Sequence, residues 1–205
     1  MRATEVLKSE HRVIERVLTC LEAIAERALG TEPLDVASAR RALDFFQHFA
    51  DRCHHGKEER CLFPLMEACG FLREGGPTGV MLHEHETGRQ YLRDMAESVE
   101  RAAAGDRDAV RRFAVQVRAY SRLLREHIFK EDNRLFVMAD HVLSSADQEA
   151  LLRSFGTMET HDMGEGTHER YLRLADELAE RYHLPKLAAA GSAAACGHCG
   201  CHAGH

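Results

Sequence analysis

The sequence predicts an all-α protein, folded as an antiparallel four-helix bundle with a C-terminal helical extension. Apolar side chains recur at helical spacing along four long segments. The links between these segments are short, which favours antiparallel neighbours. The composition is rich in Ala, Leu, Glu and Arg and contains no Trp and only four prolines. The chain of 205 residues is long enough for one substantial core.

Turn signals separate the expected helices. Gly30 and Pro33 end the first helix, and the stretch GFLREGGPTG separates the second from the third. Pro64 lies inside the second pattern, where we expect a kink or a broken last turn. Two shorter helices are expected near 145–158 and 165–182. The bundle helices are expected over 3–28, 36–69, 78–104 and 106–139.

Three regions follow from this pattern. We expect a four-helix bundle in 1–142, a helical extension packed on it in 143–185, and a flexible tail rich in Cys and His in 186–205. The net charge of −6 and the absence of a basic stripe argue against a nucleic-acid partner. No apolar stretch approaches membrane-spanning length, and the N-terminus lacks the apolar core of a signal peptide. A cytoplasmic location without membrane contact is the expectation.

Two halves of the bundle repeat one another. SEHRVIERVL in the first helix matches HEHETGRQYL in the third, which aligns His11 with His85. CHHGKEERCLF in the second matches EHIFKEDNRLF in the fourth when the shared Leu-Phe is superimposed. Each half therefore carries one His and then a His-x-x-x-Glu. The resulting set is His11, His54, Glu58, His85, His127 and Glu131.

All six of these residues fall on the apolar stripes of their helices. A single such histidine is usually a hydrogen-bonded core residue, but burying two unpaired carboxylates is costly. A bound cation is the simplest compensation. Nitrogen and oxygen ligands suit iron or manganese, and zinc less well. Two carboxylates from opposite helices can each bridge two ions, so we expect a dinuclear centre with open positions.

The motifs HHGKEERCLFP, EHETGR and EHIFKEDNRLF resemble the hemerythrin-like, His-His-Glu cation-binding family in its bacterial H-HxxxE-H-HxxxE form, over roughly residues 3–140. The resemblance implies a non-haem centre of two iron ions inside the bundle. Oxygen-carrying members of that family have a fifth histidine ligand, with two on the third helix. Here His83 and His85 are two residues apart and do not share a helical face, so His83 is expected to be solvated or behind the ligands. This departure puts reversible oxygen carriage in doubt.

The doubled motif offers a second His–Glu pair, His55 and Glu59. These residues lie about 100° around the helix from His54 and Glu58. They form either a polar flank with satisfied hydrogen bonds or a reserve that partners the ligands or replaces the fifth one. The repeat favours His54 and Glu58 as the inner pair, because only one histidine stands at this place in the fourth helix.

The C-terminal regions contain two further candidate sets. His161, Glu165 and His168 would share a face if their segment is helical, and this segment either caps the bundle or supplies a ligand. The tail could bind metal through soft thiolates and imidazoles, or could have no role in metal binding. Its candidate ligands are Cys196, His198, Cys199, Cys201 and His202.

The expected function is binding of, or reaction with, a small oxidant (oxygen, hydrogen peroxide or nitric oxide) at a carboxylate-bridged di-iron centre. Whether the protein turns over its ligand, as a catalase, a peroxidase or a nitric oxide-reactive enzyme, is left open, since no acid–base residue can be named. The alternatives are storage, sensing or delivery of iron with the tail as intake arm, and a redox-inert bundle that holds zinc.

Overall fold

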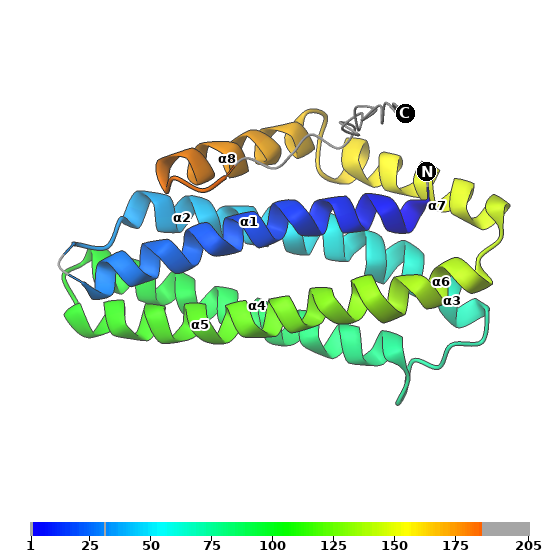
Figure 1. Cartoon of the computed structure of the whole chain (residues 1–205), viewed down its shortest axis with the longest axis horizontal. Coiled ribbons are helices and arrows are strands. Elements are labelled where there is room, and N and C mark those ends of the chain that lie inside the picture. The colour runs from blue at the N-terminus through cyan, green and yellow to red at the C-terminus, as the bar shows by residue number, and fades with distance from the viewer. Residues whose placement is uncertain (1, 31, 186–205) are drawn as a thin grey trace, which may run out of the picture.

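The computed structural model describes residues 2–30 and 32–185 and consists of helices joined by short connections. Four long helical segments lie side by side, and two further helices cover one side of them (Figure 1). The first segment packs beside the second and the fourth, and the third packs beside the same two. The predicted all-α fold is confirmed. No helix in the described part of the chain has the length and apolar character needed to span a membrane.

Two of the bundle segments are single regular α-helices, and their ends match the expectation to within two residues: α1 (Ala3–Leu29) and α4 (Pro77–Ala103). The second segment runs through α2 (Val36–Phe45), η1 (Phe46–His55), η2 (Glu58–Leu62) and α3 (Phe63–Ala68). The fourth runs through α5 (Arg107–Lys130), η3 (Glu131–Leu135) and α6 (Phe136–Val142). The η segments are π-helical, and such wider turns inside helices occur frequently at functional sites.

Side-chain caps fix where several helices begin. The carboxylate of Asp35 accepts from the backbone N–H of Ser38, 3.0 Å away, at the start of α2. Asp106 does the same for α5, 2.9 Å from the N–H of Asp108. Each cap satisfies N–H groups that the helix itself leaves without a partner.

The broken last turn that was expected at Pro64 does not occur. Pro64 occupies the first turn of α3, where a missing N–H is tolerated, directly after the π-helical turn of η2. The wider turn takes up the register change, so the chain continues along the same segment to Ala68.

The apolar core consists of two clusters separated along the bundle axis. One includes Ile14, Phe46 and Leu124, and the other includes Leu7 and Phe136. On α1 the buried residues between the two clusters are Glu10 and His11. The polar residues singled out in the sequence occupy the corresponding band on every bundle segment, so apolar packing encloses them from both ends.

The extension lies over α1 (Figure 1). It comprises α7 (Ser145–Thr157), the π-helical turn η4 (Met158–Asp162) and α8 (Thr167–Arg181), and both α7 and α8 pack on α1. Tyr171 and Leu178 of α8 are buried in the larger apolar cluster. Residues 186–205, which contain the Cys/His tail, lie outside the described residues.

Candidate metal centre

Five imidazole rings and two carboxylates meet in the band between the two apolar clusters. Their ligand atoms form two groups, within each of which all atoms lie within 4.8 Å of one another. We call these groups the first and the second donor set. The first set comprises His11, His54, Glu58 and Glu131, and the second comprises His55, Glu58, His85 and His127.

Each of the two carboxylates turns one oxygen toward each donor set. The distances from a carboxylate oxygen to an imidazole Nε2 are 3.6 Å (Glu58 to His54), 3.5 Å (Glu58 to His85), 3.2 Å (Glu131 to His11) and 3.2 Å (Glu131 to His127). Different oxygens of each carboxylate make the two contacts. A carboxylate placed in this way is suited to bridge two ions held by the two sets.

Several of these atoms are buried without a hydrogen-bond partner. Both carboxylate oxygens of Glu58 and both of Glu131 have none, and the same is true of Nε2 of His11 and Nε2 of His54. Both glutamates are 0% exposed. Buried polar groups are normally paired, and unpaired buried carboxylates are costly. Cations bound between the two donor sets would satisfy all of these atoms, so the residues present fit a metal centre.

Every imidazole in the two sets also contacts a carboxylate through its other nitrogen, Nδ1. The pairs are His11 with Asp132 (2.8 Å), His54 with Glu10 (2.9 Å), His55 with Asp51 (3.3 Å), His85 with Glu59 (2.7 Å) and His127 with Glu84 (2.9 Å). A carboxylate on Nδ1 fixes the ring and its tautomer and leaves Nε2 free to bind metal. This is the usual arrangement behind metal-bound histidines.

Four of these five carboxylates obey the same two-fold repeat as the histidines. Glu10 precedes His11 as Glu84 precedes His85, and each of the two glutamates pairs with the histidine of the following His-x-x-x-Glu. Asp132 likewise corresponds to Glu59. The sequence motifs alone did not identify four partners of the histidines: Glu10, Asp51, Glu84 and Asp132. The Glu-His dipeptide in both SEHR and HEHE was the available signal.

The structure brings His55 into the second donor set. Its ring stacks on that of His85 with centroids 3.8 Å apart, and the residue is buried. His54 and His55 both face the interior because η1 is π-helical, and its wider turn reduces the angle between successive residues. The structure thus groups His55 with three other candidate donors, while its Nδ1 also contacts Asp51. Position 128, its repeat equivalent, is Ile128, so this imidazole is the asymmetric member of the centre.

The other candidates fall outside the two donor sets. Glu59 is the carboxylate behind His85, and His83 is exposed. His161 and Glu165 are exposed, so the shared face expected of them with His168 does not reach the centre. The reason is that η4 ends at Asp162 and a turn with left-handed Gly164 and Gly166 intervenes before α8. His168 instead lies with Nε2 3.4 Å from Glu10. The tail candidates Cys196, His198, Cys199, Cys201 and His202 lie outside the described residues.

Burial and neighbouring charges favour neutral imidazoles at several positions of the centre. Burial and the neighbouring His11 lower the pKa of His54 to about 4, and burial and His55 lower the pKa of His85. Burial and the adjacent Glu131 raise the pKa of Glu58 well above its usual range. Glu131 shows the reverse: although burial opposes ionisation, the positive charges of the nearby His127 and His11 imidazoliums keep the pKa of Glu131 well below its usual range. Neutral imidazole is the form that binds a metal.

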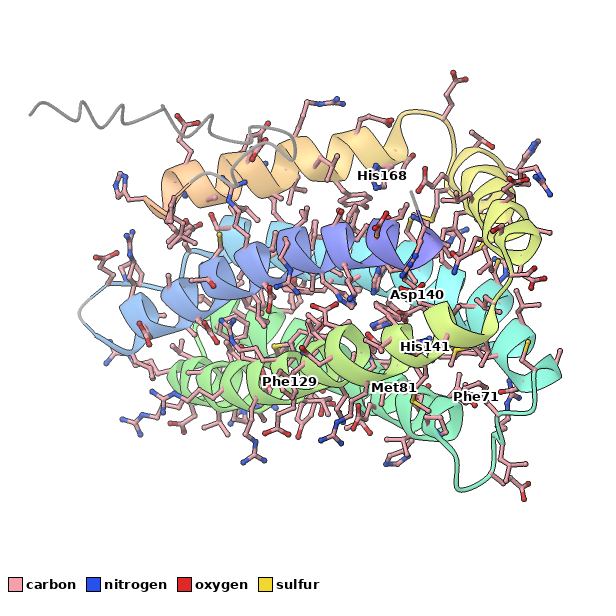
Figure 2. The ribbon with its side chains drawn as sticks, turned by 45° about the vertical axis from the view of Figure 1, so that its right-hand side comes forward. Phe71, Met81, Phe129, Asp140, His141 and His168 are labelled. Carbon is pink, nitrogen blue, oxygen red and sulfur yellow. The ribbon has the colours of Figure 1, made fainter. Side chains whose placement is uncertain are left out.

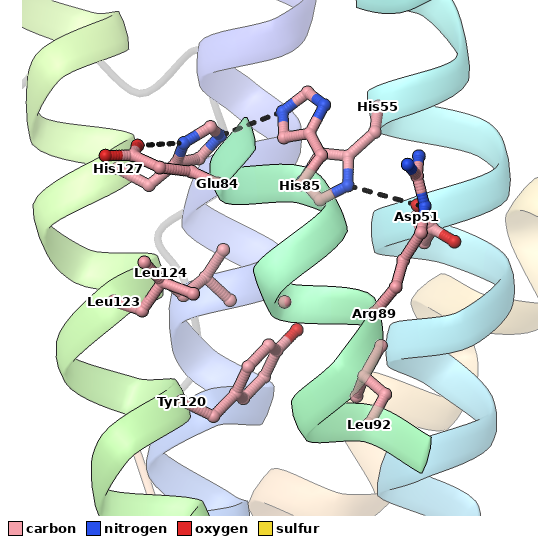
Figure 3. Close-up of a pocket in the computed structure, with 11 residues that line it drawn as sticks. Asp51, His55, Glu84, His85, Arg89, Leu92, Tyr120, Leu123, Leu124 and His127 are labelled. Carbon is pink, nitrogen blue, oxygen red and sulfur yellow. Dashed lines mark hydrogen bonds and ion pairs between the residues drawn. The ribbon is translucent and has the colours of Figure 1, made fainter. Parts of the chain in front are cut away.

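A small cavity adjoins the second donor set (Figure 3). Its volume is about 10 Å³, the space of a single water-sized molecule. Gly88 lines it on α4, and Leu92, Tyr120 and Leu124 form its apolar wall below the imidazoles of His85 and His127. A Cβ added at Gly88 would lie 3.6 Å from the ring of Tyr120, an ordinary contact, so the glycine leaves open space that a larger side chain would fill.

Comparison with known proteins agrees with this geometry. The sequence model described as "Hemerythrin HHE cation binding domain" matches residues 2–139, which span all four bundle segments. The chain belongs to this family. The resemblance that the sequence motifs suggested is thereby confirmed, and the match ends just before the extension begins.

Curated relatives of this hemerythrin HHE protein are distant. The "Uncharacterized protein Rv1995" of Mycobacterium tuberculosis and the "Uncharacterized protein Mb2018" of Mycobacterium bovis are each 26% identical over 163 residues, covering 80% of this chain and 63% of the relative. The chain thus spans less than two thirds of the length of these relatives. The "Iron-sulfur cluster repair protein YtfE" of Dickeya chrysanthemi is 35% identical over 89 residues, 42% of this chain and 40% of that protein. No solved structure matches the chain.

Family membership and the two donor sets together identify a metal-binding domain. The family match accounts for the bundle and its His/Glu residues. Residues 143–185 lie beyond it and add contacts beside the centre, from Glu159 to Lys57 and from His168 to Glu10.

Proposed function

We propose that this hemerythrin HHE protein holds two iron ions, one in each donor set. At this centre it binds or reacts with a small oxidant: oxygen, hydrogen peroxide or nitric oxide. The observation that carries the proposal is the convergence of five imidazoles and two carboxylates, each carboxylate oriented toward both sets. Bound iron would supply electrons and a free coordination position to the oxidant.

The number of donors supports a reactive centre. Five imidazole nitrogens and four carboxylate oxygens give nine protein ligands. Two six-coordinate ions accept about twelve. About three positions are left for water, a bridging oxygen or an exogenous molecule, and an open position distinguishes reactive sites from structural ones.

The residues of the chain contribute binding, orientation and exclusion of water. The carboxylates on Nδ1 hold the five rings, while the apolar clusters around Leu7 and Ile14 keep bulk solvent away from the ions. The cavity beside Gly88 and Tyr120 has about the space of a single water-sized molecule. This size favours a diatomic or peroxide ligand over an organic substrate.

The proposal is tested by purifying the protein loaded anaerobically with iron(II). Iron content and the near-ultraviolet and visible spectrum are recorded before and after addition of oxygen, hydrogen peroxide or nitric oxide, with zinc-loaded protein as the silent control. We expect about two iron ions per chain and a spectrum that changes with at least one oxidant. Evolution of oxygen from peroxide over many cycles would add an enzymatic activity. Retention of zinc alone, or an iron spectrum that none of the three alters, would contradict the proposal.

Iron handling is a second candidate function. A relative named as an iron-sulfur cluster repair protein shares 35% identity over 89 residues, and the tail of this chain carries Cys196, Cys199 and Cys201. Under this alternative, the iron is cargo and the tail helps to take it up. Transfer of iron to an apo-acceptor that becomes slower when residues 191–205 are deleted would support it. Unchanged loading and transfer after the deletion would count against it.

A further inference from the structure

Lys57 lies between the metal centre and the C-terminal extension. Its side chain is 0% exposed, and its ammonium group donates to Glu10 and to Oε1 of Glu159, 2.5 Å away in η4. Nζ also lies 5.6 Å from the centre of the Phe155 ring of α7. A buried ammonium is tolerated only when it is paired. Two glutamates, one from the bundle and one from the extension, provide that pairing.

This contact reaches the first donor set through Glu10. One oxygen of Glu10 receives Lys57 and lies 3.4 Å from Nε2 of His168, which α8 presents toward the bundle (Figure 2). The other oxygen lies 2.9 Å from Nδ1 of His54. The extension therefore holds the carboxylate that orients one of the two imidazoles of the first donor set.

The two-fold repeat provides an internal comparison. Lys130 occupies the position equivalent to Lys57, and it pairs with Glu84, the carboxylate behind His127. Yet Lys130 is 32% exposed, whereas Lys57 is fully buried under the extension. The cavity of Figure 3 is lined by Glu84 and His127, so it lies on the half where the lysine remains exposed. The two halves share one plan but differ in what covers them.

We propose that the C-terminal extension makes the two metal positions unequal. Through Glu159, Lys57 and Glu10, it holds His54 and so retains the ion of the first donor set, while the ion of the second donor set is the exchangeable one that faces the cavity. Lys57 and Glu159 are thus positioning residues that act through Glu10. This inference rests on the proposed two-metal centre, and it assigns a role to residues outside the part of the chain that the family match covers.

The test follows release of iron(II) from the loaded full-length protein to a chelator under anaerobic conditions. Wild type is expected to release its two ions in two phases. Lys57→Met is expected to accelerate the slow phase about tenfold, the lower end of the effect seen when a group behind a metal ligand is removed. Glu159→Gln, one step further from the ligand, is expected to accelerate the same phase about threefold. Glu149→Gln, an exposed carboxylate of α7, is the matched control and should leave both phases unchanged.

Double variants separate this relay from a general loosening of the fold. If Glu159 acts through Lys57, adding Glu159→Gln to Lys57→Met should change the slow phase little, because groups in one network are not additive. Lys130→Met should accelerate the fast phase only and combine additively with Glu159→Gln. Should Lys57→Met fail to fold, Glu159→Gln remains decisive, since this side chain is 30% exposed at the edge of the cluster.

Each outcome has a definite meaning. A wild-type protein that never binds two ions refutes the proposed function itself. A wild-type protein that releases two ions in two phases, with Glu159→Gln and Lys57→Met both indistinguishable from it, refutes the role of the extension alone. Equal acceleration of both phases by Glu159→Gln would also overturn the inference, because it would show that the extension supports the bundle generally.

Discussion

Removal of the proposed metal ions should destabilise the protein strongly, because the buried carboxylates of Glu58 and Glu131 have no hydrogen-bond partner among the described residues. Glu58 and Glu131 are fully buried, and none of their four oxygens has a hydrogen-bond partner among the described residues. The perturbation is exhaustive chelation of the loaded protein, and the quantity to measure is the temperature of thermal unfolding. The prediction is a large decrease in this temperature.

The expected size follows from the burial of these groups. An unsatisfied buried polar group costs about 1–3 kcal/mol, so two carboxylates cost about 2–6 kcal/mol. In a domain of 150–250 residues, each kcal/mol shifts the midpoint by about 2–4 °C. The chelated protein should therefore unfold about 4–24 °C below the loaded protein. This is a large part of the stability of an ordinary domain, about 5–15 kcal/mol.

Differential scanning calorimetry on loaded and chelated protein, with metal content measured in each sample, tests the prediction. The double variant Glu58→Gln/Glu131→Gln is the control, because its neutral amides remove the charge that the ions compensate. Chelator should then shift its midpoint little. A wild-type protein stripped of all metal that still unfolds within about 2 °C of the loaded form would refute the reasoning, since its carboxylates would then be satisfied without metal.

Three further predictions concern single residues. His55→Gln should weaken binding of one of the two ions at least tenfold, as measured by isothermal titration with iron(II) or cobalt(II). The control His83→Gln, at an exposed position of α4, should leave binding unchanged. Equal effects of the two variants would show that His55 is not a ligand. Gly88→Leu should fill the cavity and slow the reaction with peroxide or nitric oxide in stopped-flow measurements. Gly88→Ala should react at close to the wild-type rate, and both variants should keep their metal content. Unaltered rates in the leucine variant would show that the oxidant does not reach the centre through this cavity. Asp35→Ala should cost about 1–2 kcal/mol in urea unfolding because it removes the α2 cap. Although burial raises the pKa of Asp35, hydrogen bonds from Ser38 and Arg181 lower it to about 2. The contribution of Asp35 to the free energy of unfolding is therefore complete above about pH 4 and is lost between about pH 4 and pH 2. An alanine variant that is still less stable than wild type by the same amount at pH 2 would contradict this assignment.

The sequence by itself determined the helices and pointed to the buried His and Glu residues of the candidate centre. Helical periodicity and turn residues located the bundle segments to within a few residues, because caps such as Asp106 and breaks such as Gly30 act locally. The repeat between the two halves aligns His54 with His127 and Glu58 with Glu131 from the sequence alone. A buried carboxylate on an apolar stripe needs a partner in any fold, so a cation could be expected from the pattern alone.

Only the tertiary structure decided what surrounds those residues. His55 reaches the second donor set because the helix is π-helical there, and that change of helical turn has no signature in an idealised 100° wheel. The carboxylates behind the histidines mostly come from neighbouring helices, as Glu10 does for His54, so spacing within one segment cannot reveal them. The difference between Lys57 and Lys130 likewise arises where the extension packs on α1, far away in the sequence. The candidate donor residues are thus encoded along each helix, whereas the difference in burial between Lys57 and Lys130 arises only from how separate helices pack.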